Sequence, residues 1–207
     1  AQARPFAQAR RDWLAGEVAA SERYEVDIDG LRLHGRVADV HPRGLVRLRA
    51  DALNGNAALR WGLDWLLANA AGANLPLVQF HGGDGGPGPH VIDAPDPAQA
   101  RDALRQLLAL HAQGLREPLP FAPYTGWDIW NADPEERRAA GRKRWHGDGN
   151  GGWAEGEGEA IRLALRGRDP FASDADYRAL ERTSLRVYDL VRTGRARTDD
   201  AAEGEAA

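Results

Sequence analysis

The sequence contains no cysteine and no methionine, and its 27 basic residues include only one lysine, Lys143. Without cysteine the chain can form no disulfide, no cysteine-ligated zinc, haem or iron–sulfur site and no thiol nucleophile. No apolar run approaches the roughly 18 residues that a membrane-spanning helix needs, and the first residues contain no apolar signal region. We therefore predict a cytoplasmic protein without a membrane partner. Because the sequence does not begin with methionine, we also expect it to be a piece of a longer chain.

The composition indicates one folded domain with an acidic end. The chain has 207 residues, of which 43% are hydrophobic, and this is enough for one good-sized core. The formal net charge is −4, and residues 199–207 hold four acidic residues and no basic one, so the rest of the chain is neutral. A neutral body lacks the strongly basic character of an independent DNA-binding protein. We divide the chain into a lead-in helix or linker (1–21), a domain (22–192) and an acidic, disordered tail (193–207).

An antiparallel meander is predicted between residues 22 and 50. Apolar and polar residues alternate there in three runs, 24–28, 31–37 and 45–49, as they do in half-buried strands. Asp29-Gly30 separates the first two runs and is a strong signal for a two-residue hairpin turn. These residues therefore predict three consecutive strands.

Helices and two further strands follow the meander. Residues 56–71 are predicted to form a helix, because Leu59, Leu63, Leu66 and Leu67 fall on one helical stripe. Asp96-Pro97 is typical of the start of another helix. The remaining predicted elements are strands at 75–80 and 91–92, helices at 97–113, 133–146 and 175–192, and a short apolar segment at 160–166. These elements indicate an α/β fold class that begins with the succession strand–strand–strand–helix–strand.

Glycine-rich loops give no cofactor site. Gly83, Gly85 and Gly88 fit the G-x-G-x-x-G pattern, but a dinucleotide site needs a helix to begin there, and Pro87 and Pro89 follow instead. The P-loop and H-E-x-x-H patterns are missing, and the six histidines are scattered. These motifs therefore predict no metal site and no cofactor in this chain.

A basic segment with neighbouring tryptophans has two interpretations. Arg142, Lys143 and Arg144 stand beside Trp145 on a predicted helix. The segment is either a solvated helix face or a contact for the phosphate backbone of DNA, with Trp145 or Trp153 available for base stacking. Both interpretations stay open.

Several segments, taken together, resemble one family. In this order and spacing they resemble the C-terminal domain of the RecC family, the gamma subunits of exodeoxyribonuclease V, over roughly residues 22–192. The segments are residues 33–37, 44–50, 65–67, 114–123, 145–147 and 163–171, and Val187-Tyr188.

The resemblance implies a fold and a set of partners. The C-terminal domain of RecC subunits is similar to the PD-(D/E)XK nucleases. The resemblance therefore implies an inactive, nuclease-like α/β fold with a mixed sheet flanked by helices. It implies RecB-like and RecD-like partner subunits in the RecBCD complex, an ATP-dependent helicase and exonuclease for double-strand-break repair by homologous recombination. It also implies contact with double-stranded and forked DNA near the point of strand separation. Mg²⁺ and ATP would be used by the partner subunits.

The nuclease motif is degenerate in this sequence. Active relatives carry Gly-x-x-Asp on one strand and Asp-x-Lys on the next, and the two acids bind Mg²⁺. Here Gly35-Arg36-Val37-Ala38 puts Ala38 at the first acid, and Arg47-Leu48-Arg49 puts Arg47 at the second acid and Arg49 at the lysine. We expect Asp39 to face the other side of the sheet, because a shift of one residue reverses the face of a strand. The resemblance therefore implies a pseudo-nuclease.

The arginines at these positions suggest a second use for the same surface. Arg47 and Arg49 share one strand face, and Arg32 and Arg36 share a face of the neighbouring strand. If the faces coincide, the four cations could hold DNA phosphates without cutting. The alternative is that they pair with Asp27, Glu25 or a partner subunit.

Two other functions remain open. One is an active Mg²⁺-dependent nuclease with migrated carboxylates, for which Asp27, Asp39 and Asp51 are the candidates. The other is a protein–protein interaction module without any DNA contact.

Overall fold

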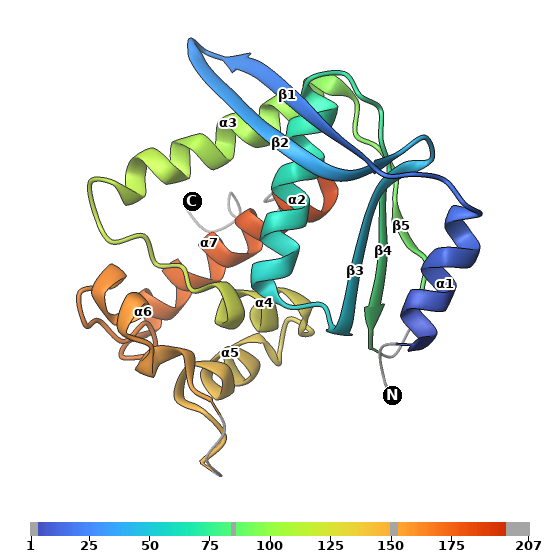
Figure 1. The fold of residues 1–207 in the computed structure, drawn as a ribbon. Helices are drawn as coiled ribbons and strands as arrows, with labels where there is room; N and C mark the ends of the chain where they lie inside the picture. The colour runs from blue at the N-terminus through green and yellow to red at the C-terminus, as the bar shows by residue number, and fades with distance from the viewer. Residues whose placement is uncertain (1–3, 84–85, 150–152, 198–207) are drawn as a thin grey trace.

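A computed structural model describes residues 4–83, 86–149 and 153–197. The elements in chain order are α1 (Arg4–Leu14), β1 (Ala20–Ile28), β2 (Leu31–His41), β3 (Gly44–Ala52), α2 (Gly55–Ala70), β4 (Leu77–Gly82), β5 (His90–Ile92), α3 (Pro97–Gly114), α4 (Pro123–Asn131), α5 (Arg137–His146), the 3-10 turn η1 (Glu155–Glu157), α6 (Glu159–Ala164) and α7 (Asp174–Thr193) (Figure 1). Gly85 and the four acidic residues predicted for the tail lie outside the described residues.

The five strands form one mixed sheet in the order β1-β2-β3-β4-β5. Strand β1 pairs antiparallel with β2, and β2 pairs antiparallel with β3. Strands β3 and β4 are parallel, and β5 is antiparallel to β4. A parallel pair needs a crossover connection, which α2 provides. The predicted α/β class, with a mixed sheet flanked by helices, is confirmed.

The main core lies between one face of the sheet and helices α2 and α3. Trp65 and Leu66 of α2 are fully buried there, together with Leu104 of α3. The prediction that Leu63 faces this core is wrong, since its side chain is 43% exposed. The helix instead turns its two large tryptophans, Trp61 and Trp65, toward the interior, because rings four residues apart lie on one helical face.

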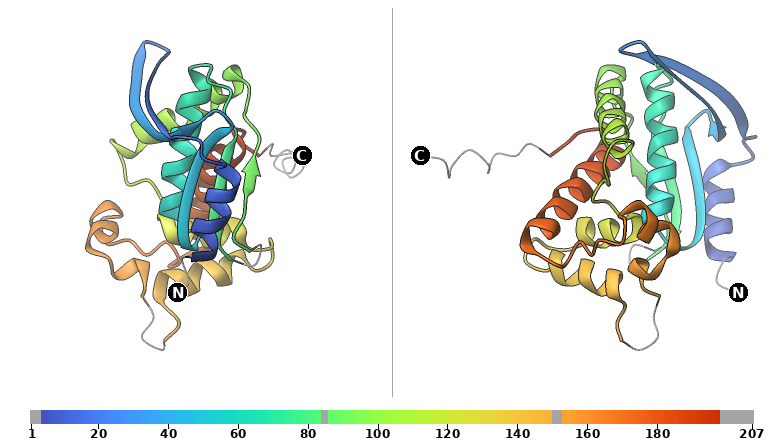
Figure 2. Two further views of the ribbon diagram at one scale, coloured as in Figure 1. Left: turned by 45° about the vertical axis from the view of Figure 1, so that its right-hand side comes forward. Right: turned by 90° about the vertical axis from the view of Figure 1, so that its left-hand side faces the viewer.

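The opposite face of the sheet is covered by α1 (Figure 2). Leu14 packs against Val46 of β3 and Phe80 of β4, and Trp13 meets Phe80 edge-on. The predicted lead-in segment 1–21 thus contains a helix that contacts the sheet. None of the helices in the described ranges has the length and apolar character that crossing a membrane requires.

Helix α7 connects the helices that cover the sheet, α2 and α3, to α4. Its residues Leu180, Ser184, Val187, Leu190 and Val191 are all buried. It packs against α2 and α4. Helix α4 is not among the helices that the sequence pattern predicts.

Strands β2 and β3 separate soon after they meet. They pair only through Val40↔Leu45 and His41↔Gly44, and the β1–β2 hairpin then bends away from β3 (Figure 1). At the far end of the hairpin, Asp29 accepts a hydrogen bond of 2.7 Å from Arg105 of α3. The hairpin is therefore held at both ends, and a gap opens between β2 and β3.

Candidate functional site

The gap between β2 and β3 forms a cleft of about 480 Å³. Four elements line it: α1, β2, β3 and α2. Its charged residues are Arg10 of α1, Arg36 and Asp39 of β2, Arg47 of β3, and Arg60 and Asp64 of α2. The cleft therefore brings together Ala38 and Arg47, the two residues predicted to stand at the acid positions of a degenerate nuclease motif, with cations from both neighbouring helices.

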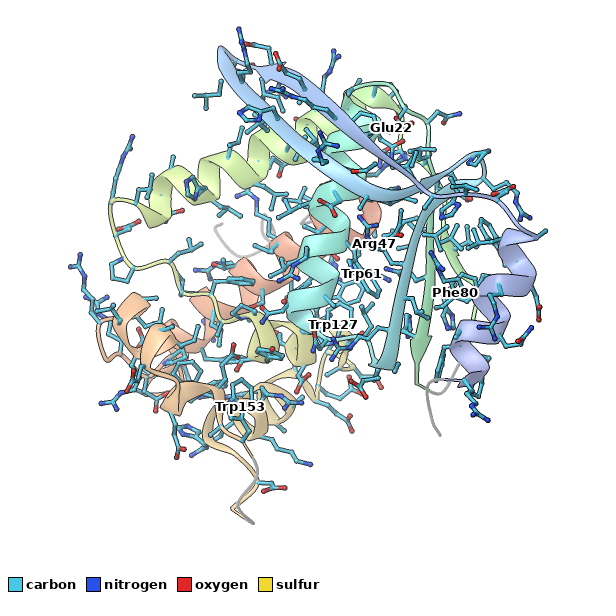
Figure 3. The ribbon with its side chains drawn as sticks, in the orientation of Figure 1. Glu22, Arg47, Trp61, Phe80, Trp127 and Trp153 are labelled. Atoms are coloured by element: carbon cyan, nitrogen blue, oxygen red, sulfur yellow. The ribbon has the colours of Figure 1, made fainter. Side chains whose placement is uncertain are left out.

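Arg47 occupies the centre of this cleft. Its side chain is only 9% exposed, and its guanidinium donates to the Asp64 carboxylate at 2.6 Å and to the Ala38 carbonyl at 2.7 Å. The Asp39 carboxylate lies 3.8 Å away on the other side. A buried cation needs such partners, because desolvation of an unpaired charge is costly. Arg47 thus bridges β3, the bent part of β2 and α2 (Figure 3).

The expectation that Asp39 faces away from Arg47 is wrong. Between Val37 and Val40 the β2 strand contains one residue more than the paired stretch of β1, which is a β-bulge. Asp39 itself has a φ of 54°, outside the extended region. The bulge interrupts the alternation of side chains and turns the Asp39 carboxylate toward Arg47 and toward Arg10, whose guanidinium lies 3.6 Å from it.

The residues of the cleft do not fit a divalent cation. The two carboxylates are separated by a guanidinium, and Ala38 offers no side-chain oxygen at the first acid position. Asp27 accepts a hydrogen bond from Gly30 within the hairpin turn, and Asp51 lies 3.7 Å from Arg49. Among the residues that the structure describes, no group of three histidine, aspartate or glutamate side chains could hold a metal.

The cleft carries an excess of positive charge. Four arginines and two aspartates line it, and both aspartates already contact Arg47. Arg36 and Arg60 are exposed at the rim and have no ion-pair partner within the described parts of the chain. These two guanidiniums are therefore free to meet an anion from solution.

The predicted surface of four arginines is not formed. Arg32 lies near the tip of the hairpin and pairs with Glu25 at 3.4 Å, which is the alternative that the sequence left open. Arg49 donates to the Ala52 carbonyl at 2.9 Å and does not line the cleft. The hairpin bends away from β3, so only Arg36 and Arg47 of the four share the cleft.

Three residues of the cleft were missed by the sequence analysis. These are Arg10, Arg60 and Asp64. Arg60 and Asp64 are the only charged residues in the predicted helix 56–71, and they stand four residues apart. That isolated pair on an otherwise apolar helix was the available signal. For Arg10 the pattern offered none, since it depends on how α1 packs on the sheet.

A buried histidine lies next to the cleft. His41 of β2 is 2% exposed, and neither ring nitrogen has a hydrogen-bond partner among the described residues. Burial is the main cause that lowers the pKa of His41, and the positive charge of Arg10 lowers it further, against the opposite effect of Asp39. The imidazole is therefore kept neutral beside the arginines.

The second basic segment lies on α5, away from the cleft. Trp145 is 5% exposed and packs with Ala122 and Leu165, so the proposal that it stacks on a base is wrong. Arg144 pairs with Asp128 of α4 at 2.7 Å. Arg142 and Lys143 remain exposed, and the exposed tryptophan beside them is Trp153.

Comparison with known families gives one match. The family model described as the RecC C-terminal domain matches residues 1–134, which include the whole sheet, α1 to α3 and α4. Every charged residue of the cleft lies within the matched range. A search of curated proteins gives no match.

Proposed function

Since the chain belongs to the RecC C-terminal domain family, we propose that it is a non-catalytic module that contacts DNA near the point of strand separation. The family connects the chain with exodeoxyribonuclease V, the RecBCD complex of DNA repair and recombination. In this proposal the module also docks RecB-like and RecD-like subunits in the cytoplasm. ATP hydrolysis, unwinding and cleavage belong to those partners.

We further propose that the fold is of the PD-(D/E)XK nuclease type. The succession of three antiparallel strands, a helix and a parallel strand in one sheet supports this assignment. So does the position of the cleft, because the two strands that correspond to the nuclease motif separate there and turn Ala38 and Arg47 into the same space.

The observation that carries the proposed function is the charge of the cleft. A nuclease centre needs acids that attract Mg²⁺, and here the position that corresponds to the second acid holds a buried arginine. Arg47 and Arg10 together balance the two nearby carboxylates, Asp39 and Asp64. Arg36 and Arg60 then leave two positive charges unbalanced at the rim. Guanidiniums bind phosphate oxygens in a bidentate manner without sequence preference, so this cleft suits the DNA backbone and not its hydrolysis.

The proposal predicts modest affinity. Each phosphate neutralised by an arginine contributes about 0.9 to the slope of log K against log salt concentration. Two rim arginines on a body of neutral charge supply only a small part of a stable complex. The contact therefore positions DNA within the larger assembly, where other subunits supply further binding.

The test uses a forked DNA duplex and the 207-residue chain at several salt concentrations. We expect the double variant Arg36→Ala, Arg60→Ala to bind more weakly and to lower the salt slope by about two, one for each lost contact. Arg32→Ala is the matched control, since that arginine is exposed, lies outside the cleft and already pairs with Glu25. Equal binding by the double variant and the control would refute the DNA contact and leave docking of partner subunits as the function.

The same reactions with Mg²⁺ or Mn²⁺ test the absence of catalysis. We expect the DNA to stay intact. Metal-dependent cleavage that disappears in Asp39→Ala would overturn the non-catalytic role and establish the alternative, a nuclease with migrated carboxylates.

A further inference from the structure

We call the cleft around Arg47 the arginine cleft. A second hollow lies between α4 and α5, which do not line the arginine cleft. Its volume is about 520 Å³, within the range of about 300–1,000 Å³ typical of ligand sites. An adjoining hollow of about 460 Å³ shares Lys143 and Gly147 with it, and we call the two hollows together the α5 groove. We propose that this α5 groove binds single-stranded DNA, with an unpaired base stacked on Trp153. The proposal rests on the proposed function only in taking DNA as the ligand.

Trp153 is the feature that points to a base. Its side chain is 57% exposed, whereas the other tryptophans are buried or half-buried. Tyr124 braces the indole in an edge-on contact, with ring centres 4.9 Å apart, and Asn56 holds the Tyr124 hydroxyl at 3.0 Å. The ring is therefore held in place and still presents an open surface to the groove. Such a platform accepts any base, because every base has a flat aromatic face.

The charges of the groove suit the strand that carries the base. Arg144 is fixed by Asp128 at 2.7 Å and joins the two helices, while Asp148 also lines the hollow. Arg142 and Lys143 are exposed on the other side and have no carboxylate partner in the described ranges. The groove thus combines an aromatic platform at one end with cations along its length, as in proteins that bind single strands without sequence preference.

The ligand is a single strand and not a duplex. In a duplex the bases are stacked on each other, and flipping one out costs a few kcal/mol. The arginine cleft offers no aromatic platform of this kind and matches a phosphate backbone alone. Arg47 and Trp153 lie at separate places in the molecule (Figure 3). A DNA fork presents both forms of DNA, so the two sites would read its duplex and its unpaired strand.

The experiment titrates the 207-residue chain with three probes and follows tryptophan fluorescence and affinity. The probes are a ten-nucleotide oligothymidine, an abasic oligomer of the same length and a ten-base-pair duplex. We expect oligothymidine to quench the fluorescence and to bind more tightly than the abasic oligomer. Trp153→Ala should weaken oligothymidine binding about tenfold, as expected for the loss of one stacked base. Trp153→Phe should keep the affinity within about twofold and lose the quenching.

Matched controls separate stacking from charge and from folding. Leu163→Ala removes another exposed apolar side chain, and Arg116→Glu reverses another exposed cation, so neither should change binding. Lys143→Glu should weaken oligothymidine and the abasic oligomer alike. Equal binding of these two probes by the wild type, or a Trp153→Phe variant as weak as Trp153→Ala with unchanged thermal unfolding, would overturn the proposal.

The outcome can be told apart from that of the proposed function. The double variant Arg36→Ala, Arg60→Ala should bind duplex more weakly and still show full quenching by oligothymidine. If that variant binds duplex normally while Trp153→Ala no longer binds oligothymidine, the proposed duplex contact of the arginine cleft is refuted and the proposed single-strand site in the α5 groove is supported. The reverse result would retain the cleft and reject the groove.

Discussion

At the scale of single residues, Arg47 contributes both to the stability of the fold and to the charge of the cleft. It fills the centre of the cleft and binds groups from two other elements, β2 and α2. Removing it leaves Asp64 without its partner and the Ala38 carbonyl without its donor. We expect Arg47→Ala to lower the free energy of unfolding by about 2–3 kcal/mol, because a largely buried ion pair loses one member. Arg49→Ala, two residues along the same strand, should change it by no more than about 0.5 kcal/mol. Urea unfolding of both variants measures the difference, and equal effects would contradict this role.

Glu155 is a buried cap supplied from a distant part of the chain. It is 2% exposed, and its two oxygens accept from the backbone amides of Tyr124 at 3.1 Å and Thr125 at 2.6 Å. The residue that precedes α4, Ala122, provides no capping side chain. We expect Glu155→Ala to destabilise the fold by about 2 kcal/mol, since two amides at a helix start lose their acceptor. The exposed neighbour Glu157 is the control, and a comparable loss in Glu157→Ala would refute the capping role.

His41 gives the fold a dependence on pH. The pKa of His41 in the native state is lowered from the ordinary value of 6.5. Just below that pH, His41 is therefore protonated in the unfolded chain and still neutral in the native protein. The contribution of His41 to the free energy of unfolding should therefore be fully present above about pH 6.5 and decrease as the pH falls below it. Burial lowers the pKa of His81 in the same direction. We expect His41→Gln to reduce the loss between pH 7.5 and 5.5, and His34→Gln, at an exposed position, to leave it unchanged.

The residue pattern predicted some site residues and missed others for physical reasons. Ala38 and Arg47 could be placed on neighbouring strands because the sequence resembles a family whose nuclease-like motif has fixed positions there. Asp39 could not, because a bulge changes the register without any mark in the sequence. Trp145 and Trp153 are eight residues apart and equal in chemistry, and only packing decides which of them is buried.

At the scale of elements, the crossing of α2 and α7 depends on one glycine. A Cβ atom at Gly62 would lie 2.3 Å from the carbonyl oxygen of Val191 and 2.6 Å from its Cβ. The two helices would have to move apart. We expect Gly62→Ala to destabilise the protein by about 2 kcal/mol, although alanine favours a helix by about 1 kcal/mol. Gly114→Ala meets nothing closer than 3.6 Å and should be neutral or slightly stabilising by thermal unfolding. Destabilisation by both would mean that the close helix crossing is not the cause.

Elements defined by local signals could be predicted, and elements defined by distant ones could not. The Asp29-Gly30 turn and the Asp96 cap, which accepts from Gln99 at 2.8 Å, lie where the sequence indicates them. Helix α4 begins at Pro123 in a proline-rich stretch, and its cap comes from Glu155, about one-seventh of the chain further on. No window of local sequence contains both groups, so propensity alone could not identify this helix.

At the scale of the whole molecule, the core extends beyond the range that matches the family. The match ends at residue 134, but Leu190 of α7 is buried in the same core as Trp65, and Val191 packs with Ala58. We expect a chain of residues 1–134 to lose cooperative unfolding and to bind a hydrophobic dye, because α2 would expose its apolar surface. A chain of residues 1–197 retains every described core residue and should unfold as the full chain does. A cooperative transition in the shorter chain would contradict the shared core.

Arg47 also limits how this sequence can change over generations. Its guanidinium balances Asp39 and Asp64, so a single mutation of Arg47 to an acid would gather three carboxylates around one hollow. Carboxylates at such short distances disfavour one another's charged form. The variant would therefore be less stable, without having gained a ligand in exchange. We therefore expect an acid at this position to be better tolerated after a change at Asp39 or Asp64 than in the present sequence.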